Sequence, residues 1–89
     1  MLSREITIVN KLGLHARAAA KFVNLASSFE SEILLRRNGQ SVNGKSIMGV
    51  MMLAAAKGTT LELSAEGSDA ENALRQLDAL VADRFGEEE

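Results

Sequence analysis

The chain has 89 residues, 46% of them hydrophobic, and its 12 acidic and 10 basic side chains give a formal net charge of −2. This length fits one small domain, residues 1–89, and the charge gives no general attraction to nucleic acid or an anionic membrane. The lack of cysteine and the single histidine exclude disulfides and the usual zinc sites, so no metal or cofactor is expected. Without a signal peptide or an apolar run of ~20 residues, a cytoplasmic protein without membrane insertion is expected.

The first part of the chain predicts a strand followed by a helix. Residues 4–9 alternate apolar and polar side chains, with Ile6 and Ile8 on one face, as in a half-buried strand. Residues 16–27 instead repeat apolar side chains at the spacing of an amphipathic helix. The expected buried stripe of this helix consists of Ala19, Phe22, Val23 and Ala26.

A β-hairpin is expected next. Residues 31–37 alternate again, which predicts a second strand. Asn38-Gly39 follows directly, and both residues tolerate the positive φ angles that a two-residue hairpin turn requires. Residues 40–43 would therefore form a short return strand.

The remaining sequence predicts a helix, a strand and a last helix. Helical spacing begins at Ser46, and Lys57-Gly58 has the composition of a helix end. Residues 59–66 then alternate as a fourth strand.

A capping box is expected to begin the last helix, because Ser68 is followed three residues later by Glu71. The apolar face of this helix would contain Ala70, Ala73, Leu74, Leu77 and Val81, with Phe85 closing it. Residues 86–89 form an acidic tail, which we expect to be flexible and solvated. The order β-α-β-β-α-β-α predicts a two-layer α+β domain in which one face of the sheet is buried under the helices.

His15 is the most informative residue for function. Gly13 precedes it, Arg17 follows it, and the first predicted helix begins directly after it. The free N–H groups and the dipole at a helix start favour negative charge, a neutral imidazole is a nucleophile, and arginine is a good phosphate partner. These residues indicate a histidine that carries a phosphoryl group, although a surface histidine beside a solvated arginine is also compatible with the pattern.

Residues 39–46 match the P-loop pattern of two glycines followed by lysine and serine, which taken alone suggests a nucleotide-binding enzyme. Gly39 already has a role in the predicted hairpin, however, and residues 40–43 then form a strand. A chain of this length also has no room for the parallel sheet and the magnesium-binding acid that such enzymes need. We therefore keep nucleotide binding only as the alternative function.

Ser46 has two interpretations, both at the start of the second predicted helix. It can be an N-cap, since serine is favoured there, or a phosphorylation site, since a phosphate is also favourable at a helix start. The following residues include more apolar side chains than one short helix can bury against a sheet: Ile47, Met48, Met51 and Met52. A helix buried on both sides would explain them, but an exposed patch for partner docking is favoured.

Residues 10–23 resemble the first signature of the HPr family, the histidine phosphocarriers of the bacterial phosphotransferase system, and residues 44–51 resemble its second signature. The resemblance implies an open-faced sandwich with four antiparallel strands in the order 1-4-2-3 and three helices on one face. It also implies that His15 takes a phosphoryl group on Nδ1 from enzyme I and passes it to a IIA-type protein, with Arg17 assisting the phosphate. The protein would thus be a stoichiometric carrier, not an enzyme, and most simply a monomer.

The resemblance further assigns a regulatory and a docking role. Ser46 would be the target of an HPr kinase/phosphorylase in bacteria that possess one. The shared docking face would consist of Ala16, Ala20, Ile47, Met48 and Met51. The sequence departs from many sugar-transport members at Ala18, where those members have proline. The run Ala18-Ala19-Ala20 resembles the nitrogen-related branch, or the truncated systems of some proteobacteria, and this leaves the downstream acceptor open.

Overall fold

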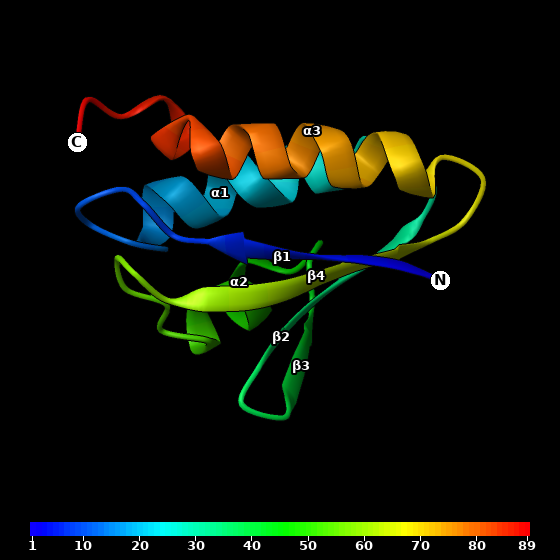
Figure 1. Ribbon diagram of the computed structural model, residues 1–89, viewed down its shortest axis with the longest axis horizontal. Helices are drawn as coiled ribbons and strands as arrows, with labels where there is room; N and C mark the ends of the chain where they lie inside the picture. The colour runs from blue at the N-terminus through cyan, green and yellow to red at the C-terminus, as the bar shows by residue number, and fades with distance from the viewer.

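A computed structural model describes all residues, 1–89. The four strands form one antiparallel sheet in the order β1-β4-β2-β3, and the helices cover one face of it (Figure 1). The fold and the strand order implied by the resemblance are confirmed. The elements are β1 (Leu2–Thr7), α1 (Ala16–Ala26), β2 (Glu32–Arg37), β3 (Gln40–Asn43), α2 (Ile47–Met52), β4 (Thr60–Glu66), α3 (Ala70–Ala82) and a 3-10 turn (Arg84–Gly86).

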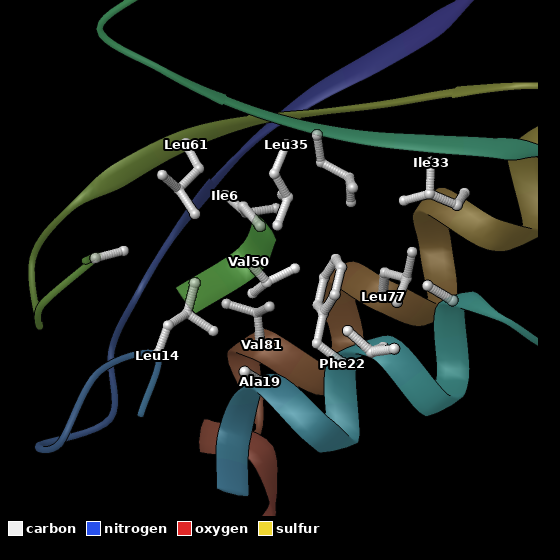
Figure 2. Close-up of a cluster of buried hydrophobic side chains, with 14 of the residues drawn as sticks. Ile6, Leu14, Ala19, Phe22, Ile33, Leu35, Val50, Leu61, Leu77 and Val81 are labelled. Atoms are coloured by element: carbon white, nitrogen blue, oxygen red, sulfur yellow. The ribbon is translucent and has the colours of Figure 1, made fainter. Parts of the chain in front are cut away.

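The core lies between the sheet and the helices and is almost entirely aliphatic. Phe22 of α1 packs in its centre, with Leu35 from the sheet and Leu77 of α3 nearby (Figure 2). The predicted stripes of α1 and α3 are all buried, which confirms both helical spacings. Phe85 is fully buried as expected, and it fixes the chain beyond α3 against the core.

The hairpin between β2 and β3 forms as predicted. Asn38 and Gly39 have φ angles of 51° and 81°, the left-handed conformation that this turn requires. Residues 40–43 pair with β2 as a strand, so residues 39–46 contain a turn, a strand and a second turn. This segment is not a phosphate-cradling loop, and the argument against a P-loop is confirmed.

The second helix is shorter than the sequence predicts. It ends at Met52 and not near Lys57, and Ala54 has a φ angle of 49°, outside the helical region. The Arg37 guanidinium on β2 donates to the carbonyl oxygens of Leu53 and Ala54 at 2.7 and 3.2 Å. This cation satisfies carbonyl groups that the end of a helix leaves free.

The predicted capping box is wrong. The residue before α3 is Asp69, and neither it nor Ser68 makes a side-chain cap. The Ser68 hydroxyl instead donates to Glu30, while the Asp69 carboxylate accepts from the backbone N–H of Glu30 and from both the N–H and the hydroxyl of Ser31. The carboxylate therefore ties the start of α3 to the loop that precedes β2.

Candidate functional site

His15 is the N-cap of α1. Its backbone is extended, with φ −72° and ψ 177°, and its carbonyl oxygen accepts from Ala19 N–H at 2.8 Å, the first helical hydrogen bond. Its ring nitrogen Nδ1 accepts from the backbone N–H of Arg17 at 3.3 Å. The imidazole thus folds over the first turn of the helix, with Nδ1 toward the positive end of the helix dipole, as the sequence predicts.

The loop before His15 is held by Asn10 and Gly13. The Asn10 side chain is fully buried and donates to the Gly13 carbonyl oxygen at 2.9 Å. Gly13 has a φ angle of 67°, and the next residue, Leu14, is buried and donates from its backbone N–H to Ala55 at 2.9 Å. These contacts set the position at which the chain enters α1, and therefore the direction of the His15 side chain.

The other ring nitrogen of His15 faces the C-terminal tail. Nε2 lies 2.5 Å from Oε2 of Glu87, and Asn10 donates to Oε1 of the same carboxylate at 3.0 Å. The side chain of Glu87 is only 16% exposed, so the expectation of a solvated tail is wrong at this residue. The hydrogen bond from Asn10, followed by that from His15, lowers the pKa of Glu87 below its usual value, and this carboxylate stays ionised near neutral pH.

Sequence reasoning missed Glu87 because nothing near it in the chain marks it. The tail reaches His15 because Phe85 is buried and has a left-handed φ of 56°, which turns the chain back after α3. Lys21 of α1 donates to the Phe85 carbonyl oxygen at 2.7 Å. Figure 1 shows the resulting arrangement, with the C-terminal end beside the loop between β1 and α1.

A surface pocket of about 650 Å³ opens beside His15 and is lined by Ala16, Arg17 and Glu87 among others. Arg17 is exposed and takes part in none of the three ion pairs of the structure. A guanidinium without a carboxylate partner is free to bind an anion in this pocket. The pocket thus brings together both residues that the sequence singles out.

Ser46 is the N-cap of α2, and its hydroxyl oxygen accepts from Gly49 N–H at 3.1 Å. This contact confirms the cap interpretation. The side chain is partly exposed. A partly exposed hydroxyl can be reached by a kinase, so this position is also compatible with the second interpretation, phosphorylation.

The apolar side chains that follow Ser46 lie on the surface. Met48 is 75% exposed and Met52 is 65% exposed, so these methionines do not belong to a helix buried on both sides. Helices α1 and α2 pack against one another, which brings this surface beside the His15 pocket. We call the following residues the apolar patch: Leu12, Ala16, Ala20, Ile47, Met48, Met51 and Met52. Leu12 was missed because one leucine in a polar loop has no periodic signal.

No group of three or more histidine, cysteine, aspartate or glutamate side chains lies close enough together to hold a metal ion. None of the helices combines the length and the apolar composition needed to cross a membrane.

Comparisons with known proteins all indicate one family. Residues 2–83 match the family model of the PTS HPr component phosphorylation site. The chain is 56% identical to the phosphocarrier protein HPr of Cupriavidus necator over 89 residues, which cover 100% of both chains. Its structure is similar to that of HPr-C-His from Thermoanaerobacter tengcongensis, with a TM-score of 0.96, 48% identity and 100% of both chains covered. An HPr dimer from the same organism has a TM-score of 0.79 and 48% identity, with 98% of this chain and 100% of that one covered.

Proposed function

The chain belongs to the HPr family of phosphotransferase-system phosphocarriers, and from this premise we propose that His15 accepts a phosphoryl group from enzyme I and donates it to a IIA-type protein. The observation that carries the proposal is the position of Nδ1 at the N-terminus of α1, beside the free guanidinium of Arg17. The protein would act in the cytoplasm as a stoichiometric carrier, without catalytic turnover of its own.

The chemistry follows from this position. The Nδ1 lone pair attacks the phosphorus atom of a phosphorylated enzyme I; a new N–P bond forms as the donor's bond to phosphorus breaks. The phosphoryl group on Nδ1 then faces backbone N–H groups of the first turn of α1, which have no acceptor inside the helix. Arg17 adds one positive charge to this environment. A few such donors stabilise the phosphoryl group moderately, which lets the carrier release it to the next protein.

The test is incubation of the protein with phosphoenolpyruvate and a matching enzyme I, followed by intact mass measurement. The protein should gain one phosphoryl group that is labile to acid. His15→Ala should gain none, and Arg17→Ala should gain it at least about tenfold more slowly, since a charged hydrogen bond to phosphate is lost. If His15→Ala still acquires an acid-labile phosphoryl group, the assignment of His15 is wrong.

We further propose that Ser46 is a regulatory phosphorylation site for an HPr kinase/phosphorylase in a host that has one. A phosphate there would add nearly two negative charges at the edge of the apolar patch. Enzyme I and the IIA-type protein would dock on this patch, so the added charge would weaken binding to an acidic partner surface. Incubation with ATP and a cognate kinase should produce an acid-stable phosphate that is absent in Ser46→Ala. No acid-stable phosphate with an authentic cognate kinase would reduce Ser46 to a helix cap.

A carrier that alternates between two partners is most simply a monomer, and we propose this state here. The alternative state is a dimer, the form solved for HPr from Thermoanaerobacter tengcongensis. Light scattering after size-exclusion chromatography at micromolar concentration distinguishes a mass near 9.5 kDa from twice that value.

A further inference from the structure

His15 has one ring nitrogen for phosphoryl transfer and one that faces the tail. We propose that Glu87 is a positioning residue, whose carboxylate accepts the hydrogen of His15 Nε2 and so leaves the lone pair on Nδ1. The inference rests on the proposed function, because it concerns the same phosphoryl transfer. It assigns a role to the tail that lies outside the signatures around His15 and Ser46.

The two contacts of the ring determine its tautomer. Arg17 N–H can only donate, so Nδ1, at 3.3 Å, must accept and carry the lone pair. An ionised carboxylate can only accept, so Nε2, 2.5 Å from Glu87, must carry the hydrogen. The two neighbours therefore select the same tautomer, the one whose nucleophilic atom faces the helix N-terminus.

The carboxylate is held in place from several sides. Asn10 uses its amide N–H groups to bind both the Gly13 carbonyl oxygen and Oε1 of Glu87, which connects the tail to the loop that orients His15. On either side of Glu87, the tail is attached by Lys21 to Phe85 and by the backbone N–H of Lys11 to Glu89. Loss of the Glu87 side chain would leave these backbone attachments intact.

The carboxylate also matches the charge that develops on the ring. When the neutral imidazole attacks through Nδ1, that nitrogen bonds to phosphorus in addition to its two ring carbons as the donor's bond to phosphorus breaks. The ring becomes cationic, with the hydrogen still on Nε2. Glu87 compensates this positive charge at the opposite nitrogen without taking the proton. On transfer to the acceptor the N–P bond breaks, its electron pair returns to Nδ1, and no proton is gained or lost. An aspartate that orients a catalytic histidine acts by the same principle.

The test combines kinetics with histidine NMR on the full-length chain. Glu87→Ala is compared with the wild type and with Glu5→Ala, which removes an equal charge from an exposed residue of β1 that does not line the pocket. For phosphorylation of the protein by enzyme I and phosphoenolpyruvate, Glu87→Ala should lower the kcat of the reaction by about tenfold. The KM for the protein should be unchanged, because the apolar patch is intact. Glu5→Ala should remain within about twofold of the wild type. Glu87→Gln, whose amide oxygen can still accept from Nε2, should regain part of kcat.

NMR of protein labelled with ¹⁵N-histidine reports the hydrogen on Nε2 of His15. A purely structural role of Glu87 would leave this signal unchanged. The wild type should show a slowly exchanging hydrogen on Nε2, and Glu87→Ala should lose this protection while keeping the folded backbone spectrum. A wild-type kcat in Glu87→Ala, or a defect in KM alone, would overturn the inference. If the wild-type protein accepted no phosphoryl group at all, the proposed function would fail. A protected Nε2 hydrogen that is unchanged in Glu87→Ala would instead overturn the inference about Glu87 alone.

Discussion

The backbone N–H of Leu14 donates to the carbonyl oxygen of Ala55 at 2.9 Å. This hydrogen bond joins the loop that precedes His15 to the segment that follows α2. That segment follows directly on α2, the helix that Ser46 caps. Damage to this junction should therefore affect both stability and phosphoryl transfer.

Gly13→Ala tests the junction. A Cβ atom at this position would lie 2.5 Å from the Ala55 carbonyl oxygen and 2.9 Å from the Ala56 Cα, and the φ of 67° is unfavourable for alanine. Backbone atoms must shift to make room, so we expect the free energy of unfolding to fall by roughly 1–3 kcal/mol, measured by urea denaturation.

Gly39→Ala is the matched control for this substitution. Gly39 also has a positive φ of 81°, but a Cβ atom there would meet nothing within 4 Å. The free energy of unfolding of Gly39→Ala should therefore fall by about 1 kcal/mol, from conformational strain alone. Equal losses in the two variants would contradict the predicted steric clash at Ala55.

Ser46→Ala should lower the free energy of unfolding by about 1 kcal/mol, because it removes the acceptor for Gly49 N–H at the start of α2. Ser46→Asp should be nearly as stable as the wild type, since aspartate is an equally good N-cap. Urea denaturation of both variants measures the difference. If Ser46→Asp is as unstable as Ser46→Ala, the hydroxyl contributes in another way than by capping.

The stability of the protein should decrease in acid partly through Asp69. Its hydrogen bonds from the Ser31 hydroxyl and the Glu30 backbone lower the pKa of this carboxyl below its usual 3.8. A carboxyl with a lowered folded-state pKa stabilises the fold above its unfolded-state pKa, and this contribution is lost as pH falls through the folded-state value. Asp69→Asn should therefore be less stable than the wild type at about pH 7, and the difference should shrink below about pH 4.

Urea denaturation across this pH range measures the effect, with Asp83→Asn as a control at an exposed aspartate that makes no side-chain cap. The difference between the wild type and Asp69→Asn isolates this carboxyl from Glu87, whose pKa is also lowered. A difference that is constant with pH would show that the hydrogen bonds of Asp69 do not depend on its ionisation.

Met48→Glu tests the apolar patch as a docking surface. Met48 is 75% exposed, so the substitution should leave the fold intact. A charge in the patch should weaken docking and raise the KM for phosphorylation by enzyme I about tenfold, at a similar kcat. Leu2→Glu is the control, because Leu2 is an exposed apolar residue, 47% accessible, on β1. A similar change in both variants would indicate a general effect of charge and not docking through the patch.

Local patterns were sufficient to predict most of the fold. The alternation in the strands and the stripes of α1 and α3 repeat within a few residues, and the turn at Asn38 and Gly39 depends on the conformations of those two residues. Where a distant group intervened, prediction failed. Arg37 of strand β2 binds the carbonyl groups that follow α2. The Asp69 carboxylate binds the loop before β2 and does not cap its own helix, α3.

By itself, the sequence identified His15 and Arg17, because a helix start with a histidine, an arginine and a glycine is a local arrangement. It could not identify Glu87, which is 72 residues away and belongs to a tail with the composition of a solvated end. Only the tertiary structure brings the carboxylate to the imidazole, since burial of Phe85 reverses the chain direction and Asn10 holds the carboxylate. Local pattern thus singled out the histidine and the arginine that we propose hold the phosphoryl group, and packing placed the Glu87 carboxylate beside the imidazole.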